Sequence, residues 1–139
     1  MDFTFATDAE GWTAAHDLTP LQHVDGTVTS QTTGADPYMV SSAISVLGKP
    51  GDVLVLSIAG QGTTGEASVY WGNELGGMAP ERSLGFTYAP DGALHTVRVP
   101  IGEQAQWAGH TITQLRLDPA NGEPLGQVTI DSIQLERAD

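Results

Sequence analysis

The chain has 139 residues, 40% of them hydrophobic, and its 17 acidic residues outnumber five basic ones to give a net charge of −12. Nucleic-acid binding and adsorption to an anionic membrane both need clustered basic residues, so neither partner is expected. No apolar run approaches the roughly 20 residues of a membrane-spanning helix, so we expect no membrane insertion. Cysteine is absent, which excludes disulfides and thiolate metal sites.

Apolar and polar residues alternate along much of the chain, and no segment shows a sustained helical period. Strands are predicted, in chain order, over residues 2–6, 11–17, 26–32, 37–47, 52–59, 66–72, 83–89, 93–100, 111–118 and 126–136. Turn sequences such as Asp25-Gly26 and Pro90-Asp91-Gly92 separate them. Short strands at this spacing predict an all-β fold, a two-sheet antiparallel β-sandwich of the jelly-roll type, with residues 1–139 forming a single domain.

The first and last predicted strands carry carboxylates. The first and last strands of a jelly roll commonly lie side by side, which could bring Asp2, Asp8 and Glu10 close to Asp131. The parity of apolar positions changes between Ile130 and Ile133, which predicts a bulge near Asp131-Ser132. Hard oxygen ligands suit calcium, so a structural calcium site is one interpretation. The other is that these are solvated acids at strand ends.

The outward positions of the predicted strands suggest a binding face. Its members are polar or aromatic and are Glu66, Ser68, Tyr70, Arg98, Gln114 and Arg116. An aromatic ring can cover the apolar C–H face of a sugar, while Arg and Gln bind hydroxyls, a carboxylate or a sulfate. Alternatively, Arg98 and Arg116 pair with Glu66 and Asp118 across strands.

The remaining aromatic residues and one long loop are further candidates. Trp12, Tyr38 and Trp107 lie near strand or loop starts, where a sugar-stacking surface could form. Trp12 and Trp71 are predicted in the core, whereas Trp107, in the polar stretch 103–109, is predicted to be exposed. The Gly- and Pro-rich loop 72–82 is long enough to contribute to a functional site.

Catalytic motifs are missing. Residues 60–65 match the spacing G-x-G-x-x-G, but residues 66–71 alternate as a strand where a dinucleotide site needs a helix, so a hairpin loop is predicted. There is no G-x-S-x-G elbow, and the four histidines are scattered without metal-ligand spacing. The sequence therefore predicts no catalytic centre.

Several segments together resemble a known family, the galactose-binding-like jelly-roll modules, or carbohydrate-binding modules, of bacterial carbohydrate-active enzymes. The matching segments are Phe3-Thr4-Phe5, Asp8-Ala9-Glu10-Gly11-Trp12, residues 33–38, 91–96 and 112–119, and the terminal Val128-Thr129-Ile130-Asp131-Ser132-Ile133-Gln134-Leu135. The resemblance implies glycan binding, with Asp131 as a ligand of a structural calcium beside the first strand. It does not extend to a module of known sugar specificity.

The leading hypothesis is a non-catalytic carbohydrate-binding module that targets a covalently linked catalytic domain to a polysaccharide or oligosaccharide. Its ligand-binding residues would be Tyr70, Arg98, Gln114 and Arg116 on one sheet, aided by Trp107, Glu66 or the 72–82 loop. The resemblance implies an extracellular or cell-surface segment of a longer, bacterial, secreted chain, and no signal peptide is visible in this segment itself. One alternative is a small jelly-roll polysaccharide lyase, with Tyr as proton donor or base and Arg or Gln neutralising a uronate. Another is a structural or protein-interaction sandwich without a glycan ligand, in which Tyr70 and both arginines are covered or paired.

Overall fold

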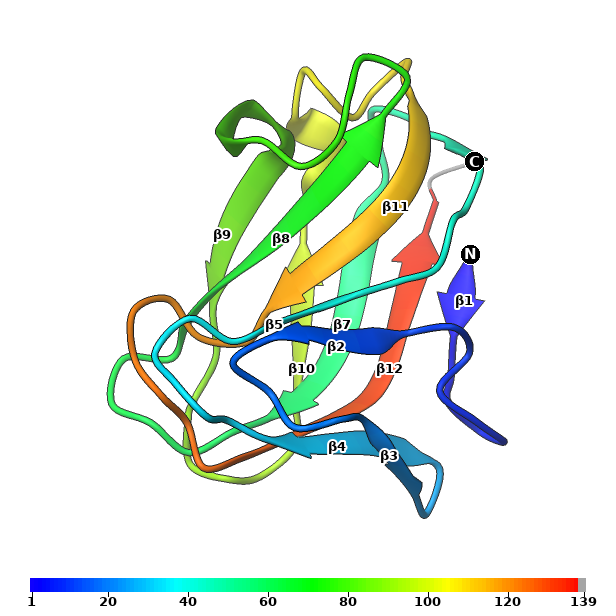
Figure 1. Cartoon of the computed structure of the whole chain (residues 1–139). Helices are drawn as coiled ribbons and strands as arrows, with labels where there is room; N and C mark the ends of the chain where they lie inside the picture. The colour runs from blue at the N-terminus through cyan, green and yellow to red at the C-terminus, as the bar shows by residue number, and fades with distance from the viewer. Residues whose placement is uncertain (138–139) are drawn as a thin grey trace.

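The computed structural model describes residues 1–137 and folds them into two antiparallel sheets that pack face to face (Figure 1). Sheet A has the strand order β10 (His95–Val99), β7 (Val53–Ala59), β12 (Gln127–Glu136), β4 (Thr27–Gln31) and β3 (Gln22–Val24), with β1 (Asp2–Phe3) also paired to β12. Sheet B has the order β2 (Thr13–His16), β5 (Tyr38–Val40), β11 (Thr111–Asp118), β8 (Glu66–Asn73) and β9 (Ser83–Thr87), with β6 (Val46–Leu47) also paired to β11. The predicted two-sheet antiparallel sandwich is confirmed.

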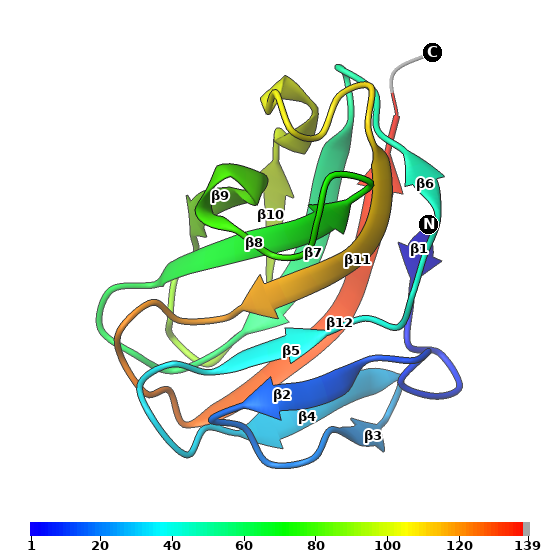
Figure 2. The same cartoon turned by 45° about the horizontal axis from the view of Figure 1, so that its top comes forward.

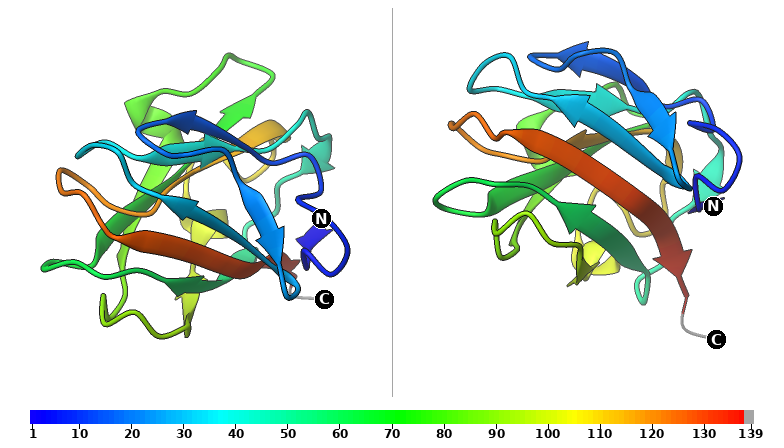
Figure 3. Two further views of the ribbon diagram at one scale, coloured as in Figure 1. Left: turned by 60° about the horizontal axis from the view of Figure 1, so that its bottom comes forward. Right: turned by 90° about the horizontal axis from the view of Figure 1, so that it is seen from below.

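The layers are clearest from two other directions. Figure 2 shows β8, β11, β5 and β2 side by side in sheet B. Figure 3, turned toward the lower end of the sandwich, shows β12 between β4 and β7 in sheet A. Two 3-10 turns complete the elements, η1 (Pro80–Arg82) and η2 (Ile101–Glu103). Among residues 1–137 there is no helix with the length and apolar character to cross a bilayer.

The core lies between the sheets and is built from the inward residues of alternating strands. Ala67, Val69 and Trp71 of β8 are buried, as their spacing predicted. Trp12 is also buried, so the prediction that Trp12 and Trp71 belong to the core is confirmed. Burying an aromatic or aliphatic side chain of this size contributes roughly 1.5–3 kcal/mol, which explains why the period-two pattern fixes the face of each strand.

The predicted strand at 37–47 is two strands, β5 and β6. Between them, the Ser41 hydroxyl oxygen accepts the backbone N–H of Leu115 at 2.9 Å, while the Ser41 N–H donates to the carbonyl of Leu115. A side-chain oxygen thus replaces a backbone carbonyl, and the regular ladder is interrupted. Strand β3 was not predicted, because its three residues are all exposed and give no alternating apolar signal.

The final strand has the predicted neighbour and the predicted irregularity. Asp2 of β1 pairs with Gln134 of β12, so the first and last strands lie side by side. In the pairing of β12 with β7 the register shifts between Ile130 and Ser132, which confirms the bulge. One extra residue at this point changes which face the following side chains meet, and this keeps both Ile130 and Ile133 in the core.

The glycine-rich loop at residues 60–65 is not a hairpin, because β7 belongs to sheet A and β8 to sheet B. The loop crosses between the sheets and is held by Glu123, whose carboxylate accepts the backbone N–H groups of Thr63 and Thr64 and both of their hydroxyls. These bonds lower the pKa of Glu123 to about 2, the Thr63 hydroxyl having the largest effect. Alternation identified β8 as a strand but could not show that its predecessor joins the other sheet.

Candidate functional site

An arginine between two tyrosines occupies the outer face of sheet B. The guanidinium carbon of Arg116 lies 3.6 Å from the ring centroid of Tyr38 and 4.4 Å from that of Tyr70. The three residues come from the adjacent strands β5, β11 and β8, and Arg116 is directly opposite Tyr70 in the ladder. All three side chains are partly exposed. We call this group the Tyr38–Arg116–Tyr70 stack.

Asp118 fixes the guanidinium of the stack. Arg116 donates from Nε to Oδ1 of Asp118 at 2.7 Å and from Nη2 to Oδ2 at 2.8 Å. The two residues are two apart on β11, so their side chains leave the same face of the strand. The Asp118 side chain is only 5% exposed. Burial raises the pKa of Asp118, although the hydrogen bonds from Arg116 act in the opposite direction. The orientation of Arg116 is therefore set before any ligand arrives.

Two further side chains border the stack. The ring of His16 in β2 stacks on Tyr38 with centroids 5.1 Å apart and an angle of 10° between the planes. Its Nδ1 lies 2.7 Å from the carbonyl oxygen of Asp36, a hydrogen bond that raises the pKa of His16. Gln114, two residues before Arg116, donates from Nε2 to the Ser41 carbonyl at 2.8 Å. The face thus has four stacked planar groups, those of His16, Tyr38, Arg116 and Tyr70, next to an anchored amide.

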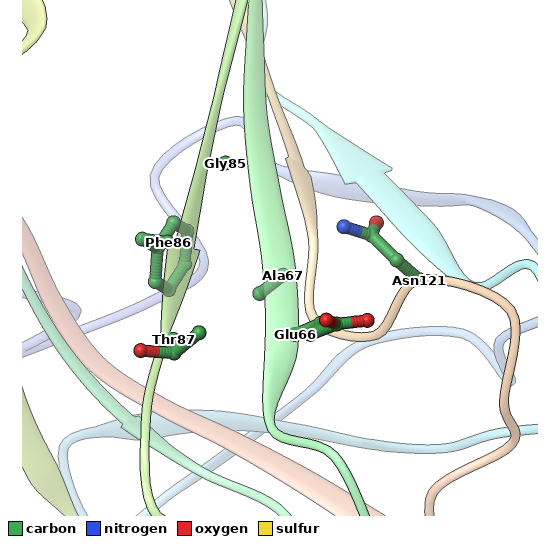
Figure 4. Close-up of a pocket in the computed structure, with 6 residues that line it drawn as sticks. All are labelled: Glu66, Ala67, Gly85, Phe86, Thr87 and Asn121. Carbon is green, nitrogen blue, oxygen red and sulfur yellow. The ribbon is translucent and has the colours of Figure 1, made fainter.

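A hollow lies next to the stack along β8 (Figure 4). Its lining residues are Glu66, Ala67, Gly85, Phe86, Thr87 and Asn121. Ser68, which accepts a hydrogen bond from the Asn121 side chain at 2.8 Å, lies between Glu66 and Tyr70 on the same face of β8. Hollow and stack are therefore continuous on one face. Gly85 keeps the hollow open, since it has no side chain on this face.

The structure brings together only part of the predicted binding face. Tyr70, Gln114 and Arg116 lie together, and Glu66 lies in the adjoining hollow. Arg98 does not belong to this face, because its strand β10 pairs with β7 in sheet A. There it forms two hydrogen bonds with Glu136, at 2.8 and 3.0 Å, and not with Glu66. Alternation predicts that Arg98 points outward but carries no information on which sheet receives the strand.

Trp107 is fully buried, so the prediction of an exposed stacking residue was wrong. Its ring meets Trp71 edge to face at 5.5 Å, and its Nε1 donates to Oδ2 of the buried Asp52 at 2.9 Å. The polar residues around it face the end of the core, where the Gln106 carbonyl accepts the indole N–H of Trp71. A polar stretch therefore closes one end of the sandwich with a tryptophan on its inner side.

The loop at residues 72–82 is fastened to the same end of the molecule. Arg82 is 9% exposed and donates from Nε to the Gly77 carbonyl at 2.8 Å and from Nη1 to Oε1 of Gln106 at 3.3 Å. The Asn73 side chain donates to the Gln106 carbonyl at 2.9 Å. The sequence predicted that this loop contributes to a functional site. Its polar groups instead largely form hydrogen bonds that hold the loop in place.

The four carboxylates of the predicted calcium site do not form one ligand set. The Glu10 carboxylate accepts the Phe5 N–H at 2.9 Å, and the Asp8 carboxylate accepts the Glu10 N–H at 2.8 Å, so both hold the loop after β1. Across residues 1–137, no group of three or more His, Asp or Glu side chains is placed to hold a metal ion. Asp2 and Asp131 do lie on the paired strands β1 and β12. A calcium ion stays a prediction from the sequence.

Sequence reasoning missed His16 and did not place Tyr38 in the site. Tyr38 was considered only as one of several aromatic residues near loop starts. Its strand β5 is three residues long, and its pairing with β11 joins segments more than 70 residues apart. The one available signal was the alternation of Tyr38, Met39 and Val40, which places Tyr38 outward once Met39 is assigned to the core.

No protein-family model and no curated protein sequence matches the chain. Solved structures with the same fold do match. The one described as CBM1 of BiXyn10A has a TM-score of 0.63 and 12% identity, covering 99% of this chain and 97% of that one. The N-terminal cellulose-binding domain of β-1,4-glucanase C from Cellulomonas fimi has a TM-score of 0.64 and 14% identity, covering 98% and 94%. CBM35 from Paenibacillus barcinonensis has a TM-score of 0.57 and 14% identity, covering 99% of each chain. The fold is therefore the jelly-roll sandwich found in carbohydrate-binding modules, as the sequence resemblance implied.

Proposed function

We propose that this domain is a non-catalytic carbohydrate-binding module and that its ligand lies on the outer face of sheet B. The observation that carries the proposal is the Tyr38–Arg116–Tyr70 stack, which holds two aromatic side chains in fixed orientation on a partly exposed surface. A sugar ring can lie with its C–H face against such planar groups while its hydroxyls reach neighbouring amides. Gln114 of β11 and Asn121 next to the hollow are such amides.

The solved structures with this fold support the proposal. They include a module specific for non-crystalline cellulose and a xylanase from Cellvibrio japonicus in complex with xylopentaose. The matching region covers 29% of that xylanase chain. We extend the proposal accordingly to a module linked to a catalytic domain in an extracellular or cell-surface protein. Tethering of this kind raises the concentration of an enzyme at its substrate.

A polysaccharide lyase is a weaker candidate. Neutralising a uronate requires a guanidinium whose charge is not already balanced, and Arg116 is paired with Asp118 through Nε and Nη2. Arg98, the other candidate, lies on the opposite sheet. An interaction domain without a glycan ligand would share the paired arginines. It differs from our proposal in assigning no ligand to the partly exposed Tyr70.

Native gel electrophoresis with a polysaccharide in the gel tests the proposal. We expect retardation by at least one member of a panel that contains β-glucan, xylan, galactan, alginate, polygalacturonate and carrageenan. Tyr70→Ala should abolish or strongly reduce it, because stacking of a sugar on the ring is lost with the ring. Tyr38→Ala should also reduce it, because the ring that holds the Arg116 guanidinium is lost. The matched control Arg98→Ala, on the outer face of sheet A, should migrate as the unmodified protein does. Retardation that survives both tyrosine substitutions would place the ligand elsewhere.

A further inference from the structure

We infer that the ligand of this face is a neutral glycan, not a uronic or sulfated one; the inference rests on the proposed function and names the class of its ligand. The sequence left both classes open, because two outward arginines in an acidic protein could serve to bind an anionic sugar. The structure separates these arginines and gives each of them a carboxylate.

Every guanidinium of the chain, all of them within residues 1–137, has a carboxylate partner within 4 Å. The pairs are Arg82 with Glu81 at 3.7 Å, Arg98 with Glu136 at 2.8 Å, Arg116 with Asp118 at 2.7 Å and Arg137 with Asp52 at 3.4 Å. Lys49 is the one lysine. Lys49 comes two residues after Leu47, which pairs with Thr111 of β11. Thr111 lies five residues before Arg116, or roughly 17 Å at the usual rise of a strand, so Lys49 is remote from the stack.

Arg116 is the one arginine on the proposed binding face, and its charge is balanced inside the stack. Nε and one N–H of Nη2 of Arg116 bond to Asp118, whose side chain is 5% exposed, so a uronate that used this edge of the guanidinium would have to displace Asp118. A buried carboxylate without its cation is strongly unfavourable, so the exchange is opposed. The charge of Arg116 is thus already balanced, and its guanidinium lies between two tyrosine rings with the side chain 19% exposed, so little of the cation is offered to an anionic sugar.

The surroundings of the stack are acidic. Glu66 is exposed at the hollow, and Asp17 and Asp36 lie within 4 Å of the His16 ring. The whole chain carries a net charge of −12. These charges repel a polyanion, whereas a hydroxyl group can donate to Glu66 and accept from an amide such as Asn121.

The experiment compares neutral and anionic polymers on the intact domain. We expect retardation by one or more of β-glucan, hydroxyethyl cellulose, xylan and galactan, and none by alginate, polygalacturonate or carrageenan. For the neutral polymer that retards it, titration calorimetry should give the same affinity at about 0.05 and about 0.5 M NaCl, a range over which the Debye length shrinks severalfold. Retardation by anionic polymers alone overturns the inference and leaves the proposed function standing. Retardation by no polymer overturns the proposed function itself.

A variant tests the part played by Asp118. Asp118→Asn removes the charge that balances Arg116 and keeps a side chain of the same shape. In protein shown to be folded by near-ultraviolet circular dichroism, this variant should gain retardation by polygalacturonate that the unmodified domain lacks. Folded Asp118→Asn without this gain would contradict the role given to the Arg116–Asp118 pair. If the variant does not fold, the polymer comparison on the unmodified domain decides the inference alone.

Discussion

The outer faces of the two sheets each carry an arginine in the middle of a strand, and the two have different surroundings. Arg98 on sheet A is 56% exposed and pairs with Glu136, which is 57% exposed. Arg116 on sheet B is 19% exposed, pairs with an almost fully buried Asp118 and lies between two tyrosine rings. Both have two hydrogen bonds to a carboxylate, so hydrogen bonding alone does not distinguish them.

The comparison shows that burial of the carboxylate decides whether an ion pair holds its arginine in one orientation. Water and salt screen the Arg98–Glu136 pair, so the pair can open at a small cost in free energy. The Arg116–Asp118 pair cannot open without leaving a carboxylate in a poorly solvated place, so it keeps the guanidinium in a fixed plane. The fixed guanidinium in turn holds the two tyrosine rings on either side of it, whereas the pair on sheet A is exposed and holds no aromatic ring.

The largest expected effect, and the largest difference between the two faces, comes from replacing Arg116 and comparing it with Arg98. Arg116→Ala should lower the free energy of unfolding by about 3 kcal/mol, at the lower end of the range for breaking a buried pair, because Asp118 can take up a proton. Arg98→Ala should leave it without measurable change. Urea unfolding at pH 7, followed by tryptophan fluorescence, measures both.

The double variant Arg116→Ala/Asp118→Ala is the control for that comparison. It removes both charges and should recover part of the stability lost in Arg116→Ala, since no carboxylate is left unpaired. Equal, small losses for Arg98→Ala and Arg116→Ala would show that the two pairs are equivalent, and the distinction drawn between the faces would fail.

The two carboxylates should also titrate in opposite directions from their ordinary values. Burial raises the pKa of Asp118 above 3.8, whereas the hydrogen bonds from Arg98 lower the pKa of Glu136 below 4.5. Glu136 therefore contributes stability above pH 4.5 that is lost as the pH falls through its lowered value. Asp118 has the opposite sign, its contribution being present below pH 3.8 and lost as the pH rises through its raised value.

Carbon-13 NMR of the side-chain carboxyl groups between pH 2 and pH 7 measures both titrations. The chemical shift of the Asp118 carboxyl carbon should change at a higher pH than that of a solvated aspartate. The chemical shift of the Glu136 carboxyl carbon should change at a lower pH than that of a solvated glutamate. Two ordinary titration curves would mean that the two surroundings do not differ as the burial of the side chains indicates.

The smallest effect is expected at the histidine beside the stack. His16→Ala should weaken binding of the retained polysaccharide a few-fold at most, because His16 covers one face of Tyr38 but lies outside the Arg116 pair. His95→Ala is the matched control, since His95 lies on β10 of sheet A and bonds to Asp91 at 2.8 Å. Titration calorimetry at pH 7 compares them, and an equal loss in both variants would remove His16 from the site.

Much of the site could be predicted because strand alternation is visible in one sequence. The outward set Tyr70, Gln114 and Arg116 is correct, and β11 has the predicted bounds 111–118. Trp107 shows the limit of the same reasoning. Polar neighbours predicted exposure, but those neighbours satisfy hydrogen bonds at the end of the core, and Asp52, 55 residues away, accepts the indole N–H. Local polarity carries no information on such a distant partner.

The sequence by itself determined the all-β class, most strand positions, the inward faces of β8, β10, β11 and β12, and the bulge in β12. These follow from a period of two residues, which is a property of each strand alone. Only the tertiary structure decided that β10 joins sheet A, that β5 lies beside β11 and that residues 60–65 cross between sheets. Strand partnership depends on contacts between segments far apart in the chain, whose energies no local pattern records. For this reason the stack of Tyr38, Arg116 and Tyr70 exists in the sequence only as three separate residues.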